Sequence, residues 1–270
     1  MTTKISGFDV AGGGQAAGDP ALMPMPVVFL PGMLADQRMW QPALDALAVS
    51  SAGGADTNAN AVPVPPIDPI FFALSDHDSV GDMAQMVLDH APDRFALVGM
   101  SMGGYVAFEI LRRAPERVCH LMLVNTRATA DSPKIQRRRM LLAHLVAGAI
   151  PFKGVNDAML DELLHPDKRH DADLIALLTD MAETGGADVF KRQSKAVAER
   201  PDSTAVLADI TVPCSVMVGE ADGVISPHSH REMADAIKDA SFTIVPGAGH
   251  YVPLETPDAF AKGLIALLAR

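Results

Sequence analysis

Short apolar runs alternate with longer amphipathic stretches along most of the chain. The runs are continuous, whereas a strand with one solvated face would alternate apolar and polar residues. They therefore predict strands buried on both faces, which are typical of a parallel sheet covered by helices. We expect an α/β fold with a mostly parallel central sheet and helices on both of its faces. The predicted strands lie at 27–30, 70–74, 95–98, 120–124, 215–218 and 242–245.

Several amphipathic stretches between these runs carry recognisable helix starts. Ser79, with Asp82 three residues later, resembles a capping box and predicts a helix that begins just after it. Ser226 followed by a proline predicts an N-cap and a first helical position for a helix that ends near residue 240. A last helix over about 257–268 is expected to close the fold.

The alternation of strands and helices stops between residues 126 and 208. This part of the chain has several helical patterns in succession and no convincing strand, which predicts an inserted helical cap. We expect a core formed by 27–125 and 209–270, preceded by a flexible segment over 1–26. A second flexible segment rich in Gly, Ala and Pro is expected over 50–66. The predicted cap helices cover 137–150, 155–164, a stretch from Asp171 to the glycine pair at 185–186, and a fourth that ends before Pro201.

Composition narrows the kind of partner and the location. The chain has 270 residues, a formal net charge of −11 and a pI near 5.2. These values disfavour nucleic acid or an anionic membrane surface as the main partner, so we expect a small-molecule ligand. No apolar run approaches a membrane span and the first residues lack a secretory signal, which together predict a cytoplasmic protein. Cys119 and Cys214 are expected to be buried free thiols.

One serine lies in a setting that suggests catalysis. Gly99, Ser101 and Gly103 match the pattern G-x-S-x-G, with a predicted strand before them and a predicted helix after them. A sharp turn from strand to helix brings the flanking backbone together, so only glycine avoids a clash, and the serine side chain then protrudes. The turn lies at the carboxyl end of a parallel strand, where such sheets bind ligands. The alternative is a structural turn that happens to contain a serine.

A serine nucleophile needs a histidine base and a carboxylate that orients it. His250 follows the last predicted strand and a glycine-rich turn, so it is expected at the same edge of the sheet as Ser101. Asp222 follows the preceding strand in the same way and is the favoured acid. The chain order Ser101, Asp222, His250 is the one expected for a sheet-based hydrolase. Glu220 and, less favoured, Asp131 are alternative acids.

Two backbone amides are candidates for stabilising a developing oxyanion. The amide of Met102 follows the serine and opens a helix, where free N–H groups favour an anion. The amide of Met33 follows a strand and a glycine, which lets the backbone approach a substrate oxygen. A plain Pro-Gly turn is the alternative at this second position. His228 and His230 could suggest a metal pair, but they lack further ligands at suitable spacing, so we expect no metal.

Four segments together resemble the α/β-hydrolase superfamily, in particular its cofactor-free members with a helical cap, such as esterases, lactonases and enol-lactone hydrolases. The segments are FLPGML with a tryptophan downstream, LVGMSMGG, RPDSTAVLADITVPCSVMVGEAD and GAGHYVPLETPDAF. The resemblance covers about residues 27–270. It implies Ser101 as nucleophile, Asp222 as acid, His250 as base, and the amides of Met33 and Met102 as the oxyanion hole.

The chain departs from the family pattern at two places. The position before Gly32 is often histidine in the family and is Pro31 here, which leaves the amide of Met33 available but changes the local hydrogen bonding. The β-hairpin that usually opens the family fold is hard to find in residues 1–26, so a shortened first edge of the sheet is expected. Neither departure involves the three residues of the expected triad.

The resemblance implies a serine hydrolase that cleaves a carboxylic ester or lactone with a small-to-medium apolar acyl group through an acyl-enzyme, without a metal or organic cofactor. The alternatives are hydrolysis of a C–C bond, cofactor-free perhydrolysis, or a ligand-sensing module that retains the triad. The sequence specifies no oligomeric state.

The predicted cap helices should roof the site with adaptable apolar side chains, some of which would face the substrate. Arg137, Arg138 and Arg139 could recognise an acidic substrate, although a run of charges on a helix is more often a solvated face. The apolar candidates are Met140, Leu141, Leu145, Val146, Met159, Leu163, Leu178 and Met181.

Overall fold

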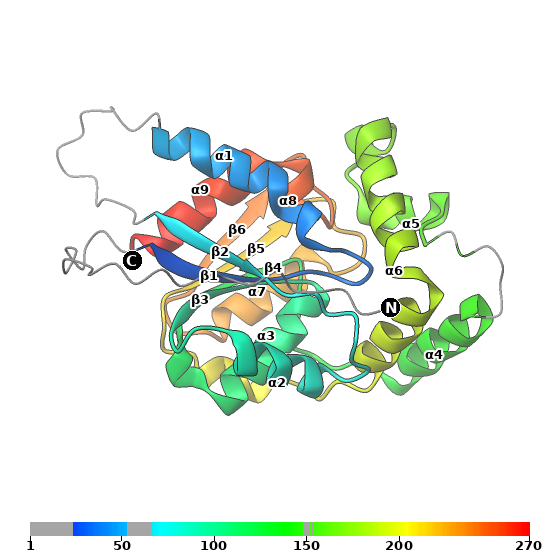
Figure 1. Cartoon of the computed structure of the whole chain (residues 1–270), viewed down its shortest axis with the longest axis horizontal. Coiled ribbons are helices and arrows are strands. Elements are labelled where there is room, and N and C mark those ends of the chain that lie inside the picture. Colours follow the sequence, from blue (N-terminus) through cyan, green and yellow to red (C-terminus); the bar gives the residue numbers. More distant parts are fainter. Residues whose placement is uncertain (1–23, 53–65, 148–151, 153) are drawn as a thin grey trace, which may run out of the picture.

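A six-stranded parallel sheet forms the centre of the molecule (Figure 1). The computed structural model describes residues 24–52, 66–147, 152 and 154–270. The strand order is β2-β1-β3-β4-β5-β6, and all neighbouring pairs are parallel, which confirms the expected sheet. The strands are β1 (Met25–Leu30), β2 (Ile67–Phe71), β3 (Phe95–Met100), β4 (Val118–Val124), β5 (Cys214–Gly219) and β6 (Ser241–Val245).

Helices cover both faces of this sheet, as expected. Figure 1 shows α1 (Gln41–Ala52), α8 (Val252–Glu255) and α9 (Pro257–Leu268) on one side of the strands. The other side carries α2 (Val80–His90), α3 (Met102–Arg113) and α7 (Pro227–Asp235). Successive residues of β1 point to opposite faces: Val28 and Leu30 join the apolar core beneath α2 and α3, whereas Val27 and Phe29 join the core beneath α1 and α9.

The strands differ in burial according to their place in the sheet. All residues of the central strand β3 are buried, as its continuous apolar run predicts. Most residues of the edge strands β2 and β6 are not buried, and Ile244 of β6 is 46% exposed. The prediction of burial on both faces was wrong for these two strands, because an edge strand has a neighbour on one side only. The strand expected at 70–74 lies at 67–71 instead.

The predicted helix starts are present, with one difference in length. The Ser79 hydroxyl accepts a hydrogen bond from the Asp82 amide at 3.0 Å and caps α2. Ser226 caps α7 through the Ser229 amide at 3.3 Å. Helix α7 ends at Asp235, before the expected residue 240, and the chain then turns through Asp239 with a φ of 59° to enter β6.

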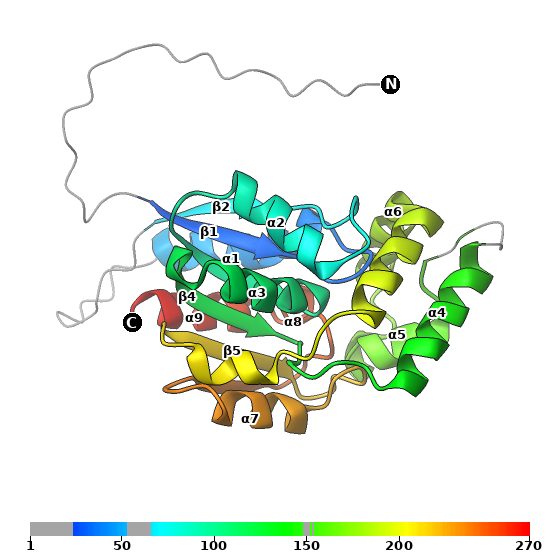
Figure 2. The same ribbon diagram turned by 90° about the horizontal axis from the view of Figure 1, so that it is seen from below.

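Three helices are inserted between β4 and β5. They are α4 (Pro133–Ala147), α5 (Asp157–Leu163) and α6 (Ala172–Ala198), and Figure 2 shows them beyond the carboxyl ends of the strands. Asp171 caps α6, and Gly186 interrupts it with a φ of 74°, close to the expected helix boundary. No strand occurs among the described residues of this insertion. Short 3₁₀ helices occur at Gln37–Trp40, Pro115–Arg117, Pro166–Lys168 and Thr204–Asp209.

The inserted helices bury fewer apolar side chains than expected. Leu178 and Met181 of α6 are buried in the core that extends from the sheet. Leu141 and Leu145 of α4 are each 60% exposed, because α4 packs against α6 along one side only. Both cysteines are free; Cys214 is buried, but Cys119 is only half-buried. Within the described residues, no helix is long and apolar enough to cross a membrane.

Two expectations lie mainly outside the described residues. Of the flexible segment predicted over 1–26, only residues 24–26 are described, and the last two of these belong to β1. The flexible segment predicted over 50–66 is described only at its ends, where residues 50–52 belong to α1. The opening hairpin of the family would also fall in the first of these segments.

Candidate active site

The turn from β3 into α3 holds Ser101 in a strained backbone conformation. Its φ is 53° and its ψ is −114°. A Cβ on Gly99 would lie 2.7 Å from the Gly103 carbonyl oxygen, and one on Gly103 would lie 2.0 Å from the Leu30 carbonyl oxygen. The backbone on either side of the serine is therefore too close for any side chain larger than glycine. This packing explains the spacing of the two glycines and stabilises the strained serine between them.

The structure brings Ser101, His250 and Asp222 together from three separate loops. The His250 Nε2 atom lies 3.0 Å from Ser101 Oγ, and its Nδ1 atom lies 2.9 Å from Asp222 Oδ2 and 3.0 Å from Oδ1. His250 and Asp222 are 3% and 6% exposed, so these contacts are shielded from water. A hydroxyl bonded to an imidazole that is bonded in turn to a buried carboxylate is the arrangement that activates a serine.

The surroundings of Asp222 keep this carboxylate ionised. Burial favours the neutral acid, but the His250 ring and the hydrogen bonds from Asn125 and Ile225 outweigh it and lower the pKa of Asp222 to about 2. The Asn125 amide donates to Oδ2 at 2.8 Å, and the Val224 and Ile225 amides donate to Oδ1 at 2.9 and 3.0 Å. An ionised carboxylate is therefore held next to the imidazole ring of His250.

Asn125 is a site residue that the sequence reasoning missed. It directly follows β4, is fully buried, and has a φ of 47°, a conformation that asparagine tolerates better than most residues. Its side-chain amide donates both to Asp222 and to the Gly249 carbonyl, the latter at 3.1 Å, so it ties the loop of the acid to the loop of the base. A polar pair directly after a buried strand, Asn125 and Thr126, was the signal available in the sequence.

Thr126 supports the serine from the same strand end. Its hydroxyl donates to the Ser101 carbonyl oxygen at 2.8 Å, and the Ser101 amide donates to the Val124 carbonyl at 2.9 Å. Gly104 leaves the room for this contact, since a Cβ there would lie 2.3 Å from the threonine hydroxyl. The end of β4 thus fixes the backbone of the serine as well as the carboxylate.

The two alternative acids are engaged elsewhere. Glu220 accepts a hydrogen bond from the Gly247 amide at 2.6 Å and lies 3.4 Å from the His165 ring. Asp131 is paired with arginines and makes no contact with the base. Of the three candidate carboxylates, the structure places only Asp222 against His250.

The backbone after β1 approaches Ser101. A Cβ on Gly32 would lie 3.4 Å from Ser101 Cβ, so this loop passes directly beside the serine. Met102 is fully buried at the first position of α3. Neither its amide nor that of Met33 donates a hydrogen bond to another group of the described residues. Both N–H groups are therefore available to an oxyanion.

Helix α6 holds the loop that carries Met33. The Gln193 side chain, 2% exposed, accepts from the Leu34 amide at 2.8 Å and donates to the Leu74 carbonyl at 2.9 Å. Leu34 itself has a φ of 55°, so this bond supports a strained residue beside the candidate donor. No local pattern around Gln193 indicates this role, because its partner lies about 160 positions away along the chain.

The loop of His250 is held by a buried carboxylate. Glu255 accepts hydrogen bonds from the amides of Gly249 and Tyr251, each at 3.0 Å, and from that of His165 at 2.7 Å. Burial raises the pKa of Glu255, against the effect of these donors. The His250 amide also donates to the Leu163 carbonyl at the end of α5 at 2.6 Å. An inserted helix thus accepts a hydrogen bond directly from the backbone of His250.

The histidines considered for a metal do not converge. His230 is fully buried with its Nδ1 atom 3.0 Å from the Ser226 carbonyl oxygen, and burial lowers its pKa. The side chain of His228 is 80% exposed. The described residues contain no group of three or more His, Cys, Asp or Glu side chains that could hold a metal ion.

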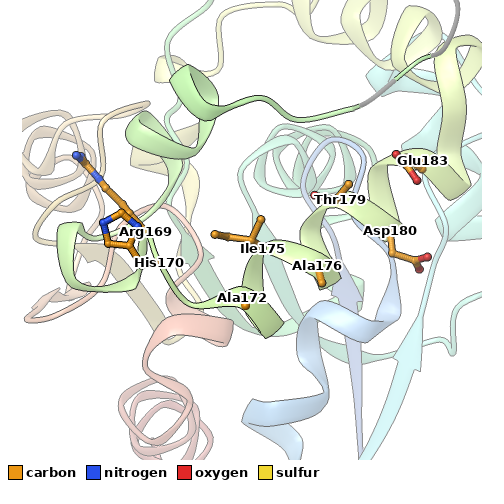
Figure 3. A pocket seen from close by; sticks show the side chains of 8 residues that line it. All are labelled: Arg169, His170, Ala172, Ile175, Ala176, Thr179, Asp180 and Glu183. Carbon is orange, nitrogen blue, oxygen red and sulfur yellow. The ribbon is translucent and has the colours of Figure 1, made fainter.

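The largest hollow that we describe lies away from the triad. It has a volume of about 630 Å³ and follows the first half of α6, and Figure 3 shows Ile175, Thr179 and Asp180 projecting from that helix along it. A smaller hollow of about 320 Å³ lies beside the loop after β1, with Pro31 and Arg38 among its lining residues. Neither hollow is lined by a residue of the triad.

A parallel sheet with a serine at a glycine-flanked turn from strand to helix is typical of the class of α/β hydrolases. A model described as "Alpha/beta hydrolase family" matches residues 27–263. The chain belongs to this family.

The relatives and solved structures that resemble this chain are named after different activities. The chain is 26% identical over 207 residues to a pimeloyl-[acyl-carrier protein] methyl ester esterase of Photobacterium profundum, covering 69% of this chain and 75% of the relative. It is 27% identical to a putative non-heme bromoperoxidase of Mycobacterium tuberculosis, covering 90% and 94%. The enol-lactonase of Burkholderia xenovorans superposes with a TM-score of 0.74 at 21% identity, covering 94% of each chain.

Proposed function

We propose that this chain hydrolyses carboxylic esters or lactones through an acyl-enzyme on Ser101. The observation that carries the proposal is the 3.0 Å contact between Ser101 Oγ and His250 Nε2. A serine hydroxyl is a weak nucleophile near neutral pH, and an imidazole at this distance can take its proton as it attacks a carbonyl carbon. Relatives that are named esterases support the same reaction class.

The first half of the reaction forms the acyl-enzyme. Ser101 Oγ bonds to the carbonyl carbon while His250 takes the hydroxyl proton, and the carbonyl oxygen becomes an oxyanion. The amides of Met33 and Met102 donate hydrogen bonds to this oxyanion. His250 then gives the proton to the leaving alcohol oxygen as the ester bond breaks. In the second half, water attacks the acyl-enzyme by the same steps and releases the acid.

Asp222 keeps His250 in the required tautomer. A carboxylate that accepts from the Nδ1 proton leaves the Nε2 lone pair facing the serine, and its charge stabilises the imidazolium that forms. Asn125 and the Val224 and Ile225 amides hold this carboxylate in place.

The inserted helices are proposed to act as a cap that selects the substrate. We assign residues 126–208 to this cap and 27–125 with 209–270 to the catalytic core. Gly32 lies beside the serine and is followed by the partly buried, apolar Met33, which supports an acyl group that is small to medium and apolar next to the reacting carbon. The reaction needs neither a metal nor an organic cofactor. The cytoplasm is the proposed location.

Hydrolysis of p-nitrophenyl butyrate tests this function. The wild-type protein is expected to release p-nitrophenol over many turnovers, and Ser101→Ala should lower kcat by at least roughly 10³-fold while its circular dichroism spectrum is unchanged. Single-turnover release without further cycles would favour a ligand-sensing module instead. Turnover retained by Ser101→Ala would contradict the proposed nucleophile.

Perhydrolysis is a second candidate for the same site. It is favoured by the relative named as a putative non-heme bromoperoxidase, which covers most of this chain. Hydrogen peroxide would replace water in the second half of the reaction, attack the acyl-enzyme and leave as a peracid. Peracid formation from acetate and peroxide, lost in Ser101→Ala, would support it. Ester hydrolysis with no measurable peracid would leave hydrolysis as the function.

A further inference from the structure

Three arginines surround one buried aspartate next to the candidate active site. The side chain of Asp131 is fully buried. Its Oδ1 atom accepts from Arg127 at 2.5 Å and from Arg200 at 2.9 Å, and its Oδ2 atom accepts from Arg139 at 3.1 Å. Arg127 comes from the loop after β4, Arg139 from α4 and Arg200 from the segment that follows α6. The cluster thus joins the catalytic edge of the sheet to the inserted helices.

The cluster carries two positive charges more than its aspartate can balance. Within the described part of the chain, Asp131 is the only acid that forms an ion pair with any of the three arginines. Burial would raise the pKa of Asp131, but Arg200 and the other two arginines lower it, so the aspartate is ionised. Partly buried charges are costly unless a partner balances them, which favours an additional anion at this place.

The three arginines are not equally occupied. Arg200 is 4% exposed, donates to the Val197 and Thr129 carbonyls, and stacks on the Tyr105 ring at 4.0 Å, so it has a structural role. The side chains of Arg127 and Arg139 are 24% and 28% exposed. Arg127 Nη1 and Arg139 Nη2 donate to no group of the described residues. These two nitrogens are free to bind a ligand.

Arg127 and Arg139 are each connected to the surroundings of Ser101 through one neighbouring residue. Arg127 directly follows Thr126, whose hydroxyl donates to the Ser101 carbonyl. Arg139 Nη1 lies 3.9 Å from the sulfur of Met33, the residue whose amide is the proposed oxyanion donor. By contrast, Arg137 and Arg138 are exposed on α4 and form no ion pair with any part of the chain that the structure describes. The arginine run therefore divides into two exposed residues and one that is bound to Asp131.

We infer that Arg127 and Arg139 form a subsite for a carboxylate group of the substrate, separated by several bonds from the carbonyl that Ser101 attacks. A guanidinium matches a carboxylate through paired N–H groups, and the ligand would supply the missing negative charge. The inference rests on the proposed function and narrows it: the substrate is the ester of an acid-bearing compound, with an apolar chain between the ester and the charge.

Matched pairs of esters test this subsite. Monomethyl adipate and methyl hexanoate differ only by a carboxylate in place of a terminal methyl group on the acyl chain. 5-Acetoxypentanoate and pentyl acetate differ in the same way on the alcohol side, so the two pairs show which half of the substrate carries the charge. In the pair whose charge lies in the half of the substrate that binds the two arginines, the charged ester should have a higher kcat/KM than the uncharged ester. The expected difference is roughly tenfold or more and arises mainly from a lower KM.

Variants of adjacent arginines provide the control. Arg139→Gln should reduce the ratio of kcat/KM between the charged and uncharged esters to near unity. Arg139→Lys keeps the charge but lacks the paired N–H groups of the guanidinium, so it should retain part of the preference. Arg138→Gln, on the same helix but exposed, should keep the wild-type preference. Equal kcat/KM values for both members of both pairs would overturn the inference, as would a preference that survives Arg139→Gln.

A binding measurement separates this inference from the proposed function. Ser101→Ala protein is titrated by calorimetry with the same two pairs of esters. Within one pair, the charged ester is expected to bind more tightly than its uncharged counterpart, and Arg139→Gln in the same background should remove the difference. Equal binding within both pairs would overturn the carboxylate subsite whether or not the wild-type protein hydrolyses esters. Tight, Arg139-dependent binding without any ester turnover would overturn the proposed function alone.

Discussion

The edge of the sheet around Ser101 and the inserted helix α4 differ sharply in how their side chains are held. At the sheet edge, Asn125, Asp222 and His250 are buried, and each makes at least two hydrogen bonds. On α4, Ala143 is the only buried side chain among those described, and Leu141 is largely exposed. The comparison shows that the side chains at the sheet edge are held by burial and hydrogen bonds, whereas most side chains of α4 are not.

Helices α5 and α6 connect these two regions. The end of α5 accepts from the His250 amide, and Gln193 of α6 accepts from the Leu34 amide beside the proposed oxyanion donor. The backbone of His250 and the loop that carries Met33 are therefore held partly by the insertion. Substitutions at the sheet edge should reduce catalysis most, those at the connections less, and those in the inserted helices least.

Substitution of the acid should have the largest effect. Asp222→Asn removes the charge beneath His250 and offers an amide that can favour the wrong tautomer, so kcat for p-nitrophenyl butyrate should fall by roughly 10³ to 10⁴-fold. Glu220→Gln is the matched control two positions away, because this carboxylate contacts Gly247 and not the base. A larger loss in Glu220→Gln than in Asp222→Asn would show that the acid is assigned wrongly.

The same carboxylate has a defined effect on acid stability. Because the pKa of Asp222 is lowered to about 2, folding favours its ionised form, and this contribution is fully present above the unfolded value of about 3.9. It is lost as the pH falls from there towards 2. Urea unfolding of wild type and Asp222→Asn at pH 6 and pH 3 should show a stability difference that shrinks at the lower pH.

Asn125 should have an intermediate effect on both activity and stability. Asn125→Ala removes the donor to Asp222 and Gly249 and places alanine at a positive φ, which should destabilise the fold by about 1–3 kcal/mol and lower kcat by roughly ten- to a hundredfold. Asn125→Gly removes the same donor, but glycine adopts a φ of 47° without strain. If glycine restored both kcat and stability, strain and not the hydrogen bonds would explain the loss.

Gln193 tests the connection between the insertion and the oxyanion loop. Gln193→Leu leaves the Leu34 amide without its partner, so kcat should fall by about tenfold with a smaller change in KM, as for a displaced oxyanion donor. Lys195→Gln on the same helix removes only an exposed ion pair to Asp78 and should leave kcat close to wild type. Equal effects of the two substitutions would argue against a positioning role.

Replacing either of two adjacent glycines of α6 by alanine should have the smallest effect. One substitution should lower the free energy of unfolding and the other should raise it. Gly186→Ala meets no neighbour but must adopt a φ of 74°, which should cost about 1–2 kcal/mol of unfolding free energy. Gly185→Ala is helical and would lie 3.4 Å from Leu34, so it should stabilise the helix by up to about 1 kcal/mol. Urea unfolding distinguishes them, and a stabilising Gly186→Ala would show that α6 is not interrupted there.

The sequence predicts the sheet and the serine turn well, because local rules decide both. Continuous apolar runs place the strands, and the glycine spacing around Ser101 follows from backbone contacts within a few residues. The exposure of β6 was missed, because its apolar run does not reveal that it lies at an edge.

Contacts between residues far apart in the chain could not be assigned from the sequence. Asn125 acts on loops about 100 positions away, and Gln193 on a loop about 160 positions away. The difference between Arg138 and Arg139 depends on which side of α4 meets Asp131, and a continuous arginine run carries no information about that side. Apolar periodicity alone also overstated the burial of α4.

Fluorophosphonate labelling with peptide mapping tests the central claim most directly, since such a reagent reacts only with an activated serine. We predict one label per chain on the peptide that contains Ser101, with labelling much slower in His250→Ala. A folded protein that takes up no label, or carries it on a different serine, would contradict the account.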